Sequence, residues 1–242
     1  MVSSENSRRF LNAYNLIDSS LRVQGDIKRN LSYSEAVRRS AKNNQIVAKY
    51  EDKLIDYGRL RNAIVHSSNE SIVIAEPHLS VVEDCERIAT LVTTPPLALG
   101  SVANQIVGCV DYDVKLKDVM EYGYSNGFSN IPIFKDGILI GVSTSPQILE
   151  VLGKKLFHKV DIGHYIENTT IESVLQEFSN RNYYAIANSK VTVDKILNMF
   201  TENRKLLLVL ITKTGSLLEP PLGIITIKDV MDINNMLDDY RL

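Results

Sequence analysis

Cysteine is nearly absent from this chain of 242 residues, and long apolar runs are absent altogether. The two cysteines, Cys85 and Cys109, have no paired spacing, which argues against a disulfide framework or a cysteine-built zinc site. The longest strongly apolar run, Leu206 to Ile211, covers six residues, far fewer than a membrane-spanning helix needs. No basic stretch followed by an apolar one marks the start of the chain. We therefore expect no signal peptide, no membrane partner and a cytoplasmic protein.

Neither positive nor negative charge dominates in this chain. Lysine and arginine total 27, against 29 for aspartate and glutamate, which gives a formal net charge of −2. This balance excludes a uniformly basic nucleic-acid binder but leaves room for a local basic face. Such a face is predicted between residues 22 and 61, which hold ten basic and five acidic residues. Basic residues on helices often form only a solvated surface, so both interpretations stay open.

Metal-ligand and nucleophile patterns are missing as well. His78, His158 and His164 show no metal-ligand spacing, and we expect surface or helix-capping roles for them. No Ser–His–Asp or Cys–His arrangement can be placed, and the glycines form no phosphate-binding loop. The sequence therefore predicts no metal and no required cofactor.

The pattern of apolar residues and glycines changes near residue 96. The segment before it contains few glycines, and its apolar residues recur at helical spacing, which predicts a compact helical domain over residues 1–96. One such stripe comprises Phe10, Ala13, Tyr14, Ile17 and Leu21. Ser32 and Glu35 have the spacing of a capping box, and Pro77 suits the first turn of a later helix.

After residue 97, short β-rich runs alternate with helical stretches. Strands are predicted at Ile131–Phe134, Ile138–Ser143, Leu206–Ile211 and Gly223–Ile227. Residues 141–148 line up with 223–230, and residues 116–120 line up with 193–197. The second copy has about five extra residues, which suit a hairpin turn. Each copy predicts the order helix, strand, turn, strand, helix, so the chain carries an internal repeat whose two sheets could bury each other.

The duplicated unit resembles the CBS-domain pair, or Bateman module, over roughly residues 97–242. The most specific part is Gly-Ile-Ile-Thr-Ile-Lys-Asp-Val at residues 223–230. The resemblance implies a tandem α/β pair after the helical domain, with repeats at 97–158 and 159–242, and thus an α+β protein. It also implies an adenine nucleotide as regulatory ligand and a homodimer through the CBS pair and the helical domain.

In that family, a strand ending in serine or threonine leads into a helix whose early aspartate holds a ribose. The resemblance assigns this role to Asp229, because a carboxylate can accept both hydroxyl protons of a ribose. Thr226 would add a hydroxyl, Ile224 would line the adenine slot, and Lys228 would face phosphate beside the helix N-terminus. The resemblance suggests three further contributors: Tyr112, Phe128 and Lys205.

The first repeat departs from this pattern. Gln147 stands where the carboxylate is expected, while Thr144 keeps the hydroxyl position. An amide accepts a hydroxyl proton with less charge assistance, so we expect the Asp229 half-site to bind nucleotide and the Gln147 half-site to be weak or empty. A second interpretation of both motifs is helix capping, in which these side chains satisfy backbone amides and the pair serves as a scaffold.

The helical domain contains Arg61-Asn62-Ala63-Ile64-Val65-His66, which resembles the motif of the HEPN superfamily. That resemblance implies a metal-independent endoribonuclease acting on single-stranded RNA, with Arg61, Asn62 and His66 as catalytic residues. Histidine titrates near neutrality and can take the 2′-hydroxyl proton, while arginine stabilises charge on the phosphate. Asn62 and His66 share a helix face, whereas Arg61 lies about 140° from His66 on an ideal helix.

Two functions follow from these resemblances. In the first, an adenine nucleotide near Asp229 controls RNA cleavage by the helical domain. In the second, the protein is a non-enzymatic nucleotide sensor whose helical domain docks a partner protein or dimerises. Arg61 and His66 would then serve only an interface.

Overall fold

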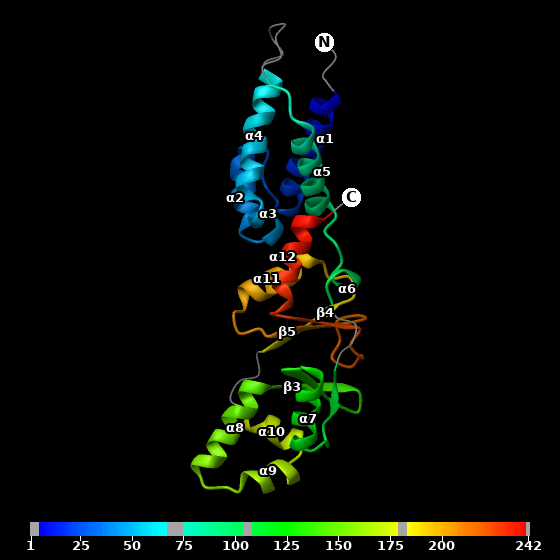
Figure 1. Cartoon of the computed structure of the whole chain (residues 1–242). Coiled ribbons are helices and arrows are strands. Elements are labelled where there is room, and N and C mark those ends of the chain that lie inside the picture. The colour runs from blue at the N-terminus through cyan, green and yellow to red at the C-terminus, as the bar shows by residue number, and fades with distance from the viewer. Residues whose placement is uncertain (1–4, 67–74, 104–107, 179–182, 241–242) are drawn as a thin grey trace. The chain divides into compact units, whose positions relative to one another are not determined.

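The computed structural model describes residues 5–66, 75–103, 108–178 and 183–240, with His66 described by its backbone alone (Figure 1). These residues form an α+β protein in two units. The first unit consists of Met1–Pro96 together with Thr192–Asn198 and Met231–Leu242, and the second consists of Leu97–Val191 with Met199–Val230. The domain boundaries given by the sequence pattern stay predictions.

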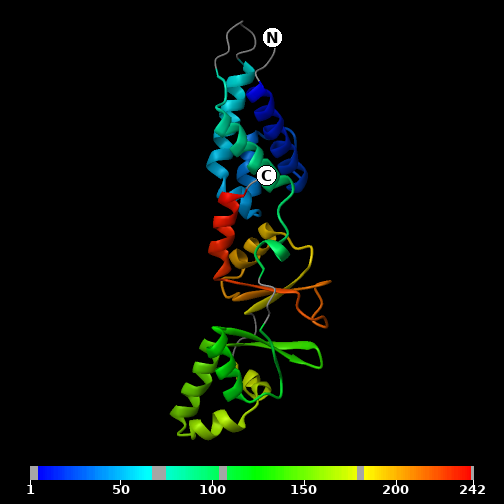
Figure 2. The ribbon, with the colours of Figure 1, turned by 45° about the vertical axis from the view of Figure 1, so that its right-hand side comes forward.

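Helices alone make up the described part of the first unit before residue 97. They are α1 (Glu5–Gln24), α2 (Tyr33–Ala41), α3 (Gln45–Lys49), α4 (Glu51–His66) and α5 (Leu79–Thr93). In two views, α1, α4 and α5 lie side by side (Figures 1 and 2). The predicted apolar stripe of α1 is buried along its whole length, and Phe10, Ile17 and Leu21 have no exposed surface. The predicted helical character of this part of the chain is confirmed.

Capping side chains explain where two of these helices begin. Ser32 caps α2 and forms the predicted capping box with Glu35, whose carboxylate accepts from the Ser32 backbone amide at 3.0 Å. At α5 the N-cap is His78, whose Nδ1 accepts from the Ser80 amide at 3.4 Å, so a capping role is confirmed for this histidine. The prediction for Pro77 is wrong, because Pro77 stands one residue before this cap.

Two three-stranded sheets with the same topology form the centre of the second unit. The strands are β1 (Val110–Asp111), β2 (Asn130–Lys135) and β3 (Ile138–Thr144) in one sheet, and β4 (Tyr184–Asn188), β5 (Leu208–Thr212) and β6 (Gly223–Thr226) in the other. In each sheet the first strand pairs parallel to the second, and the second pairs antiparallel to the third. The internal repeat and the four predicted strands are confirmed, whereas β1 and β4 are additional.

Helices accompany the sheets in chain order. They are α6 (Ala98–Ser101), α7 (Leu116–Asn126), α8 (Ser145–Phe157), α9 (Ile162–Asn168) and α10 (Ile171–Glu177). Two more, α11 (Val193–Glu202) and α12 (Asp229–Asp239), each contribute residues to both units. No helix of the described ranges combines the length and apolar character that a bilayer crossing requires.

Apolar side chains from the two sheets share a core. Ile131 and Ile133 of β2 pack with residues of α7, α8 and α10. Phe134 and Val142 of the first sheet instead join a cluster with Leu208 and Ile224 of the second sheet. The expectation that the two repeats bury their sheets against each other is therefore confirmed.

The turns between the antiparallel strands differ between the repeats. Asp136 and Gly137 close the β2–β3 hairpin with φ values of 51° and 78°, the positive angles that a two-residue type I′ turn requires. The longer segment 213–222 joins β5 to β6, and Gly215 adopts a φ of 88° within it. The extra residues of the second repeat thus lie in a hairpin connection, as the sequence predicts.

Candidate functional site

The corner between β6 and α12 positions the motif that the sequence singles out. The strand ends at Thr226, and the helix begins at Asp229. Oδ2 of Asp229 accepts hydrogen bonds from the Thr226 backbone amide at 2.6 Å and from the Thr226 hydroxyl at 2.8 Å. The capping interpretation is therefore correct for one carboxylate oxygen. Within the described ranges, the other oxygen, Oδ1, has no hydrogen-bond partner.

A pocket of about 370 Å³ lies beside this corner. The second repeat contributes Ile224, Thr226, Lys228 and Asp229 to its walls, all of them named from the sequence. The first repeat contributes Gly108, Asn126, Gly127, Phe128, Ser129 and Asn130. The cap therefore occupies Oδ2 alone, and Oδ1 has no partner among the described residues.

Phe128 gives this pocket an aromatic wall. Its ring lies so close to Gly108 that a Cβ placed on Gly108 would be 2.4 Å from Phe128 Cε2. Gly127 ends α7 in the left-handed conformation, with a φ of 69°, so that the chain turns directly before Phe128. Glycine at both positions therefore allows the Phe128 ring to form this wall of the pocket.

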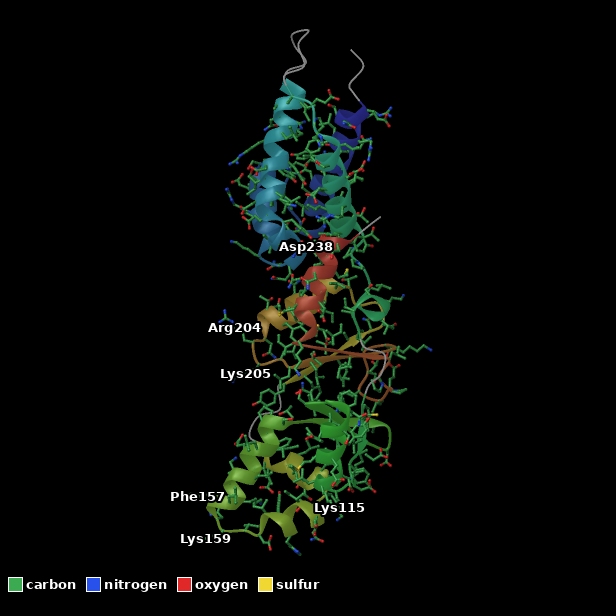
Figure 3. All side chains as sticks on the ribbon, in the orientation of Figure 1. Lys115, Phe157, Lys159, Arg204, Lys205 and Asp238 are labelled. Carbon is green, nitrogen blue, oxygen red and sulfur yellow. The ribbon has the colours of Figure 1, made fainter. Side chains whose placement is uncertain are left out.

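The structure places the other two suggested contributors elsewhere. Tyr112 and Lys205 are not among the residues that line the pocket. The Tyr112 ring carries Lys135 Nζ above it, 4.3 Å from the ring centroid. Lys205 lies next to Arg204 in the segment before β5 (Figure 3). Of the three residues, only Phe128 meets the Asp229 pocket.

The equivalent corner of the first repeat is buried. Thr144 caps α8 by accepting from the Gln147 amide at 3.3 Å, and its hydroxyl donates to Gln147 Oε1 at 2.9 Å. Gln147 is 6% exposed and lines a separate pocket of about 180 Å³, whose other walls include Glu172, Tyr183 and Tyr184. This pocket has about half the volume of the one beside Asp229. The side-chain amide oxygen of Gln147 already accepts the hydrogen bond from Thr144.

The Arg–Asn–His motif lies at the C-terminal end of α4. Arg61 is partly exposed and donates from Nη1 to Oδ1 of the exposed Asn62 at 3.2 Å. His66 is the last residue of α4, but its side chain lies outside the described residues. The structure thus brings Arg61 and Asn62 together, while the catalytic role of all three residues stays a prediction. The homodimer, the RNA partner and the cytoplasmic location also stay predictions.

At its other end, α12 joins a hydrogen-bond network of the first unit. The Leu237 carbonyl accepts from Arg87 Nη1 at 2.6 Å and from the Tyr50 hydroxyl at 2.9 Å. Asp238 accepts from Lys49 Nζ at 2.9 Å, at the end of the helix where Figure 3 labels it. The hydrogen bond from Lys49 lowers the pKa of Asp238, and burial raises the pKa of Tyr50, so this hydroxyl remains a donor.

Across the described ranges, no group of three or more His, Cys, Asp or Glu side chains is placed to hold a metal ion. No protein-family model matches the chain, and no curated protein matches it. Solved structures do match. Among the similar structures are CBS-domain proteins.

Three of these structures illustrate the extent of the similarity. A CBS domain-containing protein of unknown function from Kribbella flavida is 15% identical, with a TM-score of 0.46 over 58% of this chain and 99% of that chain. The CBS domain of a membrane protein from Sphaerobacter thermophilus is 15% identical, with a TM-score of 0.43 over 57% and 88%. The CBS domain of the bacterial CNNM/CorC family Mg²⁺ transporter, in complex with ATP, is 15% identical, with a TM-score of 0.44 over 62% and 94%.

Proposed function

We propose that the second unit is a CBS-domain pair that binds an adenine nucleotide in the pocket beside Asp229. The observation that carries this proposal is that the two carboxylate oxygens of Asp229 have different environments. Oδ2 is fixed by Thr226, and Oδ1 has no partner within the described ranges. A carboxylate held in this way at a pocket wall is already oriented before a ligand arrives, which lowers the entropy cost of binding.

Each lining group suits one part of a nucleotide. Asp229 accepts hydroxyl protons of the ribose in charge-assisted hydrogen bonds. Phe128 offers a ring on which adenine can stack, an interaction worth about 1–3 kcal/mol per base. Lys228 is exposed in the turn before α12 and supplies positive charge for phosphate. The pocket thus combines an acceptor for a diol, a flat apolar wall and a cation.

Calorimetric titration of the intact chain with AMP, ADP and ATP tests this proposal. We expect saturable binding of at least one of them at one site per chain, because the Gln147 pocket is smaller and has an amide in place of the motif carboxylate. No heat with any adenine nucleotide would exclude the proposed function. Two equal sites per chain would show that the Gln147 half-site binds nucleotide as well as the Asp229 half-site does.

A second function, RNA cleavage by the first unit, is favoured by the surroundings of Arg61. This guanidinium forms no salt bridge with the described residues, and its planar set of donors suits a phosphate. We expect the intact chain to cleave single-stranded RNA in the presence of a chelator. The His66→Ala variant should lose this cleavage, because the imidazole is the proposed acceptor of the 2′-hydroxyl proton.

Gel analysis of a labelled single-stranded RNA measures the cleavage. Arg59→Ala is the matched control, because Arg59 is exposed on the same helix and paired with Asp56. Cleavage that persists in His66→Ala, or an intact chain that leaves RNA uncut, would exclude the nuclease. A chain that binds nucleotide but cuts no RNA would instead favour the non-enzymatic sensor with a docking helical domain.

A further inference from the structure

The first unit contains a pocket that the functions above do not use. Its volume is about 600 Å³. Arg39 and Ser40 line it from the last turn of α2, and Thr192, Asp194 and Lys195 line it from the start of α11. All of these residues belong to the first unit.

Hydrogen-bond partners are missing around this pocket. Three buried oxygens of its lining residues have none in the described structure: Ser40 Oγ, Thr192 Oγ1 and Asp194 Oδ1. Two other side-chain atoms of the described residues share this property, Tyr33 Oη and Ser143 Oγ, and neither belongs to a residue of this pocket. Buried polar atoms are nearly always paired, so three unpaired oxygens on residues that line one pocket point to a ligand that supplies donors.

Thr192 and Asp194 do not have the usual roles of threonine and aspartate at the start of a helix. Thr192 stands at the N-cap position, since its carbonyl accepts from the Ile196 amide at 3.1 Å, yet its hydroxyl caps no backbone amide. Asp194 is 8% exposed. Aspartate in a first helical turn commonly interacts with the helix dipole while exposed to water, as Asp52 does at the start of α4. Burying such a carboxylate with an unpaired oxygen is costly unless a cationic donor meets it.

We propose that this pocket binds a small zwitterion with a primary ammonium group and a carboxylate, the chemistry of a free amino acid. An ammonium group has three N–H donors, the number of unpaired oxygens here, and its charge compensates that of Asp194. The hydroxyls of Ser40 and Thr192 would turn about χ1 to meet it. Arg39 and Lys195 line the same pocket and supply positive charge for the carboxylate of the ligand.

Thermal unfolding of the intact chain, with each of the twenty protein amino acids added singly, tests this proposal. At least one amino acid should raise the unfolding midpoint in a saturable manner, because it binds the folded state alone. Asp194→Asn should abolish this rise, and Ser40→Ala, which removes one acceptor, should weaken it. Asp52→Asn is the matched control and should keep the full rise, because Asp52 has the same position in α4 but is exposed.

The ligand-free proteins give a second readout. Asp194→Asn should unfold at a higher temperature than the parent, because it removes the charge of a largely buried carboxylate whose Oδ1 has no partner among the described residues. An aspartate that only supports its helix predicts the opposite, a lower midpoint, as expected for Asp52→Asn. A lower midpoint for ligand-free Asp194→Asn would overturn the proposal. So would a parent that responds to inorganic phosphate but to no amino acid. Asp229 variants should respond to amino acids as the parent does, so failure of this site and failure of the nucleotide site are distinguishable.

Discussion

Asp229→Asn is expected to weaken adenine-nucleotide binding by about tenfold to a hundredfold. A hydrogen bond to a charged group contributes about 1.5–3 kcal/mol, and each 1.4 kcal/mol is a factor of ten in affinity. Asparagine retains an oxygen that can accept from the Thr226 amide, so the cap of α12 survives while the charge is lost. Asp229→Ala removes both, and the lost cap should cost a further 0.5–2 kcal/mol or so of folding stability. Calorimetry measures the first effect, and urea unfolding measures the second.

The matched control for this experiment is Asp232→Asn. Asp232 is exposed on the next turn of α12 and does not line the pocket, so its variant should bind nucleotide as the parent does. The ligand can be altered as well, because 2′-deoxy-ATP lacks one of the hydroxyls that Asp229 is proposed to hold. The parent should prefer ATP to 2′-deoxy-ATP, and Asp229→Asn should lose most of this preference. Equal affinities of parent and Asp229→Asn for ATP would show that the carboxylate does not hold the ribose.

The strands that local sequence predicts are those with continuous apolar runs. The run from Leu206 to Ile211 predicts β5, which is buried at every position from Leu208 to Thr212. By contrast, β1 is only Val110–Asp111, and one of its two residues is charged. These residues form a strand because β2 pairs with them from a distant part of the sequence. Such a partner sets strand formation as much as the residues themselves do, so a local pattern could not reveal β1.

The same limit applies to the candidate pocket. One continuous motif holds Ile224, Thr226, Lys228 and Asp229, so these residues could be named from the sequence. Gly108 and Asn130 belong to no motif and line the pocket because the two repeats fold together. The identity of Gln147 could be read directly, but its burial depends on packing around α8. Sequence thus gives the chemistry of one wall, and tertiary structure supplies the other.

Asp194 illustrates a residue that sequence reasoning missed. In the sequence it is one more aspartate in the first turn of a predicted helix, a position where exposure is the usual outcome. Its burial arises because residues 192–198 belong to the unit built mainly from the N-terminal helices. Residues 231–242 belong to that unit too, although they follow the second repeat directly. The local sequence of these two segments does not predict that they belong to the first unit, because this depends on which apolar faces meet in three dimensions.

This membership gives α12 a role in both units. The helix begins at Asp229, the proposed ribose acceptor, and its last turn is held by Arg87 and Tyr50. The last carbonyls of a helix have no partner within it and carry partial negative charge, so a guanidinium at Leu237 O is favourable on both counts. Arg87 is the contact at which a link between ligand binding at Asp229 and the last turn of α12 can be tested.

Arg87→Ala is expected to lower the free energy of unfolding by about 2–4 kcal/mol. The substitution removes one charged donor from three acceptors at once, Leu237 O, the Tyr50 hydroxyl and the Asp84 carboxylate, and a hydrogen bond to a charged group contributes about 1.5–3 kcal/mol. The Arg87 side chain is 15% exposed, whereas Arg38 is exposed on α2, so Arg38→Ala should change stability by less than about 0.5 kcal/mol. Urea unfolding compares the two variants, and equal stabilities would mean that the network contributes nothing.

If α12 transmits the ligand state, nucleotide should slow amide hydrogen exchange over residues 231–239 of the parent. Arg87→Ala should remove that slowing and, because coupling is reciprocal, should weaken nucleotide binding to the same extent although Arg87 does not line the Asp229 pocket. Slowing that persists in the variant would show that the ligand acts on this segment by another contact.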